Sequence, residues 1–304
     1  MAVPDFQSFL LPLLRIAADG KEHALAEARQ RLAAEFKLSV ADQEELLPSG
    51  RQSRFSNRVA WAKVYLEQAS LVESPKRGYF VITETGREVL KAPPQKIDIK
   101  FLEQYPSFHE FRSRGGVTGQ VVQSQQIATA EVATPEETLE TAYLQLRAGL
   151  AAEVLGRVKA NSPQFFERLV VELLLKMGYG NSRSDAGQVV GKAGDEGIDG
   201  VINEDRLGLD TVYLQAKKWD GSVGRPEIQK FVGALHGKRA KKGVFITTGT
   251  FSQEAYGYVE SIDPKVVLID GRRLAELMID FELAVATART YQVKRVDSDY
   301  FDEG

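Results

Sequence analysis

The chain contains the run GDEGIDG at residues 194–200 and, after a short gap, the alternating segment VYLQAKKW at residues 212–219. In an extended strand, Gln215 and Lys217 lie on one face while Leu214 and Ala216 lie on the other. Asp199 opens a neighbouring apolar strand, so we expect its carboxylate beside the Gln215 amide and the Lys217 ammonium. These groups suit a hard divalent cation with a phosphate next to it, which indicates a nuclease centre.

Hydrolysis of a phosphodiester needs an activated water and neutralisation of charge on phosphorus, both of which a divalent cation supplies. Asp199 is the expected first ligand. Gln215 would either ligate through its amide oxygen or position the water, and Lys217 would steady the nucleophile or the developing charge. An alternative without metal is a simple ion pair between Asp199 and Lys217 across neighbouring strands.

The composition limits the kinds of site that the chain can build. Its 304 residues are 43% hydrophobic, which is enough for two domains, and they include no cysteine and three separated histidines. Disulfides and Cys/His zinc sites are thereby excluded, so a catalytic metal would take oxygen ligands, as Mg²⁺ or Mn²⁺ does. The N-terminal apolar run is too short to span a bilayer and lacks a basic leader, which predicts a cytoplasmic protein with no membrane partner.

The net charge of −3 hides two basic stretches. Residues 48–66 carry no acid, and residues 217–242 carry eight basic side chains against two acids. Either stretch alone is as well explained by a solvated helix face. Two of them in separate domains favour a polyanionic partner.

Residues 1–92 have the pattern of helices closed by a two-stranded hairpin at 71–83, which predicts a winged-helix DNA-recognition domain. The helix over 53–69 carries polar side chains opposite its apolar stripe, and the hairpin tip is basic. Such side chains would reach base edges and phosphates in DNA. The predicted DNA-binding residues are Arg51, Gln52, Arg54, Asn57, Arg58, Lys63, Lys76 and Arg77.

The remaining chain divides into three predicted segments. Residues 93–160 read as a linker followed by a connecting helix from 136 to 159, which would pack between the domains or against another subunit. Residues 161–290 alternate helix and strand, with strands at 188–190, 198–202, 212–219, 243–248 and 266–269. This order predicts an α/β domain with a central mixed sheet flanked by helices, followed by a tail at 291–304.

Two acids on the predicted helix after Pro163 remain equivalent by periodicity. Glu167 and Glu172 lie at the same angular distance from the centre of the apolar stripe. The helical pattern therefore does not choose between them as site residues.

Several motifs resemble those of the Mrr-type restriction endonucleases, which are type IV, modification-dependent members of the PD-(D/E)xK nuclease superfamily. They are SPxxFExLV from residue 162, GDxGIDG at 194–200, QAK at 215–217 and GVFITT at 243–248. Ser49-Gly50 ahead of NRxxWA at 57–62 resembles the DNA-recognition domain of the same family, so the resemblance covers nearly the whole chain.

The resemblance implies Asp199 as metal ligand, Gln215 and Lys217 in place of (Asp/Glu)-x-Lys, and Glu167 as the helical acid that completes a metal site of Asp199, Gln215 and Glu167. Ile198 stands where the superfamily name has proline, and Glu196 stands where glycine is expected. The uncharged Gln215 leaves metal affinity to depend more on the two carboxylates.

The sequence thus predicts a Mg²⁺-dependent endonuclease, with Mn²⁺ able to replace Mg²⁺, that hydrolyses methylated double-stranded DNA. Cutting both strands needs two catalytic domains, which predicts a homodimer or higher assembly on DNA. The alternatives are a winged-helix regulator whose nuclease-like domain does not cleave, and a structure-selective nuclease resembling Holliday-junction resolvases.

Overall fold

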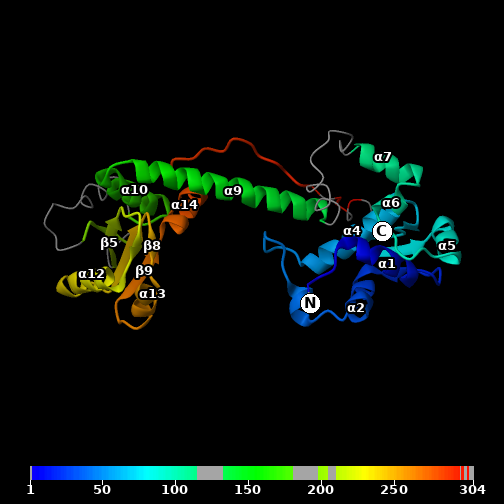
Figure 1. Ribbon diagram of the computed structural model, residues 1–304, viewed down its shortest axis with the longest axis horizontal. Helices are drawn as coiled ribbons and strands as arrows, with labels where there is room; N and C mark the ends of the chain where they lie inside the picture. The colour runs from blue at the N-terminus through cyan, green and yellow to red at the C-terminus, as the bar shows by residue number, and fades with distance from the viewer. Residues whose placement is uncertain are drawn as a thin grey trace. The chain divides into compact units, whose positions relative to one another are not determined.

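The computed structural model describes residues 2–114, 133–180, 198–204, 210–294, 296–297 and 300 (Figure 1). The chain forms two compact units, one of residues 1–144 with 294–304 and one of residues 145–293. None of the helices within the described ranges is long and apolar enough to cross a membrane.

The N-terminal unit is built from short helices, several of which begin at side-chain caps. Asp5, Ser39, Ser53 and Thr83 each accept hydrogen bonds from backbone N–H groups of the first turn that follows. The helices are η1 (Phe6–Phe9), α1 (Leu10–Ile16), α2 (Leu25–Glu35), α3 (Val40–Glu44), α4 (Arg54–Gln68) and α5 (Glu84–Lys91). The predicted helices are confirmed to within a few residues at each end.

Three short antiparallel strands complete this unit, in the order β1-β3-β2. They are β1 (His23–Ala24), β2 (Val72–Glu73) and β3 (Tyr79–Ile82). The β2–β3 hairpin was predicted, whereas the two-residue β1 is too short to give a periodic signal in the sequence.

The core of the N-terminal unit extends past residue 92. Helices α6 (Ile99–Leu102) and α7 (Pro106–Arg114) follow it, and Ile97, Ile99, Leu102 and Phe108 are buried in one cluster with the side chains of α1 and α4. The prediction of an unstructured linker is therefore wrong for this part of the chain. The pairs Pro93-Pro94 and Gly115-Gly116, which are typical of linkers, come before and after this folded segment in the sequence.

The connecting helix was predicted within a residue or two, as α9 (Pro135–Ala160). Thr134 and Glu137 cap its start reciprocally: the Glu137 N–H donates to Thr134 Oγ1, and the Thr134 N–H donates to Glu137 Oε2. Near its other end, Val154 and Val158 enter the core of the second unit.

The second unit has a four-stranded mixed sheet in the order β4-β5-β7-β9, with only β4 antiparallel to its neighbour. A small parallel pair, β6 with β8, lies beside it. The strands are β4 (Gly200–Asn203), β5 (Thr211–Lys217), β6 (Ser222–Val223), β7 (Lys242–Thr247), β8 (Thr250–Phe251) and β9 (Lys265–Ile269). The helices are α10 (Pro163–Lys176), α12 (Arg225–Gly237), α13 (Gln253–Glu260) and α14 (Gly271–Asp280).

Helices cover both faces of this sheet, as predicted. Apolar side chains of α10 and α14 pack on one face with Val212 and Leu214 of β5, and α12 and α13 pack on the other with Phe245 and Val266 (Figure 1). The predicted strand at 188–190 lies outside the described residues. The alternation of β5 leaves its last polar residues, Gln215 and Lys217, at the carboxyl end of the strand, where the candidate site forms.

Candidate active site

Asp199 and Gln215 come together at the junction of β4 and β5. The Asp199 N–H donates to the Leu214 carbonyl at 2.8 Å, which extends the β4–β5 ladder by one residue. Its Oδ2 accepts from Gln215 Nε2 at 2.8 Å and from the Ala216 N–H at 2.7 Å. With Gln215 only 6% exposed, the Asp199 carboxylate is held in one orientation at the end of the strand.

Glu167 approaches the same carboxylate from α10. The helix begins at Ser162, whose Oγ accepts from the Phe165 N–H at 3.2 Å, with Pro163 in the first turn. Burial and, secondarily, the charge of Asp199 raise the pKa of Glu167 above its ordinary value. Glu172, which periodicity left equivalent, is exposed. Of the two acids, Glu167 is therefore the one that is half-buried and within reach of the charge of Asp199.

Lys217 lies near these groups in sequence but pairs elsewhere. Its Nζ contacts Glu227 Oε2 and lies 4.6 Å from the centroid of the Trp219 ring. The alternative of a structural Asp199–Lys217 pair is therefore wrong, since Glu227 takes that place. Sequence reasoning missed Glu227. The signal that would have pointed to it is an acid in the first turn of the next helix after the strand that bears Lys217.

The oxygen donors of this site fit a hard divalent cation that takes only a few ligands from the protein. No group of three His, Cys, Asp or Glu side chains with metal-binding geometry occurs among the described residues. Two carboxylates and one amide are present, and rotation of the Gln215 amide would turn its oxygen in place of its nitrogen toward Asp199. Mg²⁺ is usually held by one or two carboxylates and keeps several waters, so this set fits it. Residues 194–197, which include Glu196, lie outside the described residues.

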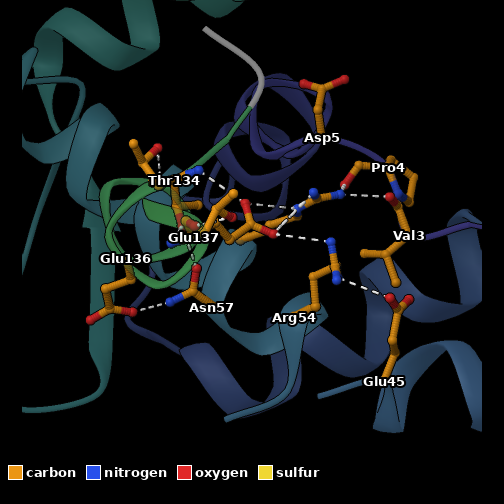
Figure 2. A network of polar contacts seen from close by, with 12 residues as sticks. Val3, Pro4, Asp5, Glu45, Arg54, Asn57, Thr134, Glu136 and Glu137 are labelled. Carbon is orange, nitrogen blue, oxygen red and sulfur yellow. Dashed lines mark hydrogen bonds and ion pairs between the residues drawn. The ribbon is translucent and has the colours of Figure 1, made fainter. Parts of the chain in front are cut away.

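The predicted DNA-reading face of α4 is covered by the start of α9 (Figure 2). Asn57 is 1% exposed; its Oδ1 accepts from Thr134 Oγ1 at 2.7 Å, and its Nδ2 donates to Glu136. Arg58 donates from Nε to Glu137 Oε1 at 3.0 Å.

Further contacts close this network from other segments. Arg58 Nη1 donates to the Val3 and Pro4 carbonyls at 2.7 and 2.8 Å, and Arg54 pairs with Glu45 at 3.0 Å (Figure 2). The expectation that Asn57 and Arg58 face solvent is therefore wrong. We expected these side chains to face solvent because they lie opposite the apolar stripe of the helix. In the structure, that face is covered by a segment almost eighty residues further along the chain.

The other predicted DNA-binding residues have varied surroundings. Lys63 contacts Glu67 at 3.2 Å and Ser74, and Lys76 at the hairpin tip pairs with Glu22 at 2.7 Å. Gln52 is half-buried and accepts a long hydrogen bond from Asn57, whereas Arg51 and Arg77 have exposed side chains.

Comparison with known proteins identifies the family. The catalytic-domain model of the Mrr family, described as restriction endonuclease, matches residues 158–278, and the model of the Mrr N-terminal domain matches residues 6–92. The chain is 38% identical to the type IV methyl-directed restriction enzyme EcoKMrr of Escherichia coli strain K12, over 99% of this chain and 100% of that protein. The chain belongs to the Mrr family of type IV restriction endonucleases. Members of this class are DNA endonucleases, and restriction endonuclease domains generally use divalent metal ions.

Solved structures similar to this Mrr-type endonuclease are distant. The MspJI restriction endonuclease in complex with a 27-mer oligonucleotide has a TM-score of 0.29 and 24% identity, over 53% of this chain and 35% of MspJI. The DNA modification-dependent restriction endonuclease AspBHI has a TM-score of 0.36 and 19% identity, over 70% of this chain and 56% of AspBHI. The chain thus spans about a third of the first protein and just over half of the second.

Proposed function

We propose that this Mrr-type endonuclease cleaves methylated double-stranded DNA with Mg²⁺ and works in the cytoplasm. The observation that carries the proposal is the approach of Glu167 to Asp199, where the pKa of Glu167 is raised by burial and by the neighbouring carboxylate. A half-buried glutamate whose pKa is raised by burial and by a neighbouring carboxylate is more typical of metal sites than of structural ones.

The residues of the site divide the work among them. Asp199, Glu167 and the Gln215 amide oxygen would hold the metal, which when bound supplies an activated water and neutralises phosphate charge. Asp199 is oriented for this by the Ala216 N–H and the Gln215 side chain. Lys217 lies two residues beyond Gln215 on the same face of β5, so its ammonium would steady the attacking water or the charge that develops on phosphorus.

DNA recognition is assigned to the N-terminal unit, as a winged helix. Support comes from its order of elements, in which α1, β1, α2, α3 and α4 precede the hairpin β2–β3 and the sheet has the order β1-β3-β2. The exposed Arg51, Lys76 and Arg77 would make the first phosphate contacts, together with the half-buried Gln52 that follows Arg51 in the chain. Arg54, Asn57, Arg58 and Lys63 would reach DNA only by exchanging their present partners.

Two catalytic units are needed to cut both strands, so the active species on DNA is proposed to be a homodimer or a larger assembly. Purified protein should be incubated with Mg²⁺ and matched plasmids, one unmethylated and one carrying methylated adenine or cytosine. The expected result is linear product from the methylated plasmid alone.

Lys217→Ala is the control for contaminating nuclease in this assay. Equal cutting of both plasmids would remove the methylation requirement from the proposal. Tight binding without cutting by the wild-type protein, with either Mg²⁺ or Mn²⁺, would remove the catalytic assignment and favour a DNA-binding regulator.

A further inference from the structure

Two side chains outside the metal-binding set contact the ammonium of Lys217. Glu227, in the first turn of α12, contacts the Lys217 Nζ through Oε2, and the Trp219 ring lies 4.6 Å from the same nitrogen. Both contacts favour an ammonium group in that place, one by charge and the other by the quadrupole of the indole face. A lysine side chain otherwise turns among many rotamers.

The Glu227 side of this clamp is anchored by the start of α12. Val223 and Ile228 on either side of the turn are fully buried, and Pro226 fixes the backbone of the first turn. The Arg225 guanidinium lies 5.0 Å from the centroid of the Tyr258 ring, which ties the same turn to α13. The carboxylate of Glu227 is therefore presented from a rigid element.

On the Trp219 side, the backbone is held by the turn that follows β7, while the indole ring is 40% exposed. The buried Thr248 donates its Oγ1 proton to the Trp219 carbonyl at 2.8 Å. At Gly249 the two segments touch: a Cβ there would lie 2.0 Å from the Gly221 carbonyl oxygen and 2.9 Å from that of Trp219. Only glycine permits this approach, which holds the chain after β5 against β7 and β8.

We propose that Glu227 and Trp219 are positioning residues that act through Lys217. They hold its ammonium in place at the end of β5 before DNA binds. The contact with the scissile phosphate then costs no further loss of side-chain conformational entropy. This inference rests on the proposed role of Lys217 in cleavage. Rigid support of this kind matters because misplacement of a catalytic group by about 1 Å can cost on the order of a hundredfold in rate.

The variants Glu227→Gln and Trp219→Leu test the clamp in the full-length protein. Glu227→Gln keeps the size of the side chain but removes its charge, and kcat should fall about tenfold to a hundredfold. Trp219→Leu should lower kcat by a smaller factor, about threefold to tenfold, because a cation–π contact is weaker than a charge pair. In both variants KM and the affinity for DNA in chelator should stay within about twofold of wild type, since the clamp acts on Lys217 and not on binding of DNA.

Glu254→Gln is the matched control, because Glu254 is an acid in the first turn of the neighbouring helix α13. It should cleave like the wild-type enzyme. Thermal unfolding of each variant shows whether a loss of rate is a loss of fold, and the Trp219 variant keeps the proposal testable where the Glu227 variant is unstable.

Lys217→Ala, measured alongside, separates this inference from the function on which it rests. If Lys217→Ala cleaves like wild type, the assigned site itself is wrong and the clamp has no catalytic group to position. If Lys217→Ala is inactive while folded Glu227→Gln and Trp219→Leu retain wild-type kcat, the clamp alone is overturned. A loss that appears in KM in place of kcat would also overturn it, since it would assign these residues to DNA binding.

Discussion

Two clusters of charged side chains in this molecule differ in how their charges are paired. At the start of α9, the buried Glu137 meets the Arg58 guanidinium, which also donates to the Val3 and Pro4 carbonyls. At the end of β5, Glu167 and Asp199 approach each other, and Lys217 turns to Glu227 instead.

The difference separates a structural cluster from a functional one. Charges that are fully paired inside a protein specify its fold, whereas acids brought together against their mutual repulsion mark a place where a ligand is expected. The predicted DNA-reading residues Asn57 and Arg58 belong to the first class as this structure stands. The predicted catalytic acids belong to the second.

The largest effect is expected at the β5 cluster from Lys217→Ala. Cleavage should fall by at least about a hundredfold, because a positioned charge at a developing anion is worth that much or more. Binding to DNA in chelator should be preserved. Initial rates of plasmid cleavage measure the first and filter binding the second, with Lys265→Ala at the start of β9 as a lysine control that retains activity.

Breaking the α9 cluster should instead cost stability. Glu137→Gln leaves the guanidinium of Arg58 buried without its carboxylate, and loss of one partner of such a pair costs about 3 kcal/mol in the free energy of unfolding. Urea unfolding measures this cost. Glu153→Gln, which breaks an exposed pair with Arg157 on the same helix, should cost about 0.5 kcal/mol or less. Equal losses in the two variants would contradict the distinction between the clusters.

A third prediction uses the raised pKa of Glu167, which is caused first by burial and second by the charge of Asp199. Because the folded chain holds the Glu167 proton to higher pH than the unfolded chain does, stability in metal-free buffer should fall as pH rises from the ordinary glutamate range through the raised pKa. Glu167→Gln removes this dependence and should leave the metal-free protein more stable than wild type near neutral pH.

Unfolding by urea in chelator at several pH values measures this effect, with Glu172→Gln on the exposed side of the same helix as control. Parallel pH curves for wild type and Glu167→Gln would show that the fold does not raise the pKa of Glu167. Added Mg²⁺ should reverse the order of stability, because it binds the wild-type pair and not the variant.

The smallest effect is expected at the hairpin tip. Lys76→Ala removes an exposed cation that forms an ion pair with Glu22. Because this pair already offsets part of the charge, DNA affinity should fall only a few-fold. The slope of log K against log salt should become less steep by about 0.9 if Lys76 contacts one phosphate. An unchanged slope would remove Lys76 from the DNA interface.

Sequence periodicity predicted those parts of the fold where apolar residues repeat over several turns or along a strand. Helix α4, strand β5 and the alternating elements after it were found in this way. Helices α6 and α7 were missed because neither shows a repeated apolar face: α6 has four residues, and the buried apolar residue of α7 is Phe108. Strand β1, with two residues, has no period at all.

The site was predicted in part for a similar reason. Asp199 and Gln215 lie at neighbouring positions of adjacent strands whose order fixes their neighbours, so local pattern was enough to bring these two together. Contacts such as Glu227 with Lys217 and Glu137 with Arg58 depend on how separate helices pack, which no local pattern contains. Glu167 was equivalent to Glu172 by periodicity. The resemblance to the Mrr-type endonucleases favoured Glu167, and in the structure Glu167 is half-buried whereas Glu172 is exposed.

The extent of the N-terminal core has a practical consequence for exchanging recognition domains between nucleases of this family. The family model of that domain ends at residue 92, but its apolar core includes Phe108 and its buried ion pair includes Glu137. A chimera joined at residue 92 would transplant a domain with part of its interior missing. A junction inside α9, between residues 144 and 150, keeps both interiors whole and makes recognition and cleavage exchangeable as intact modules.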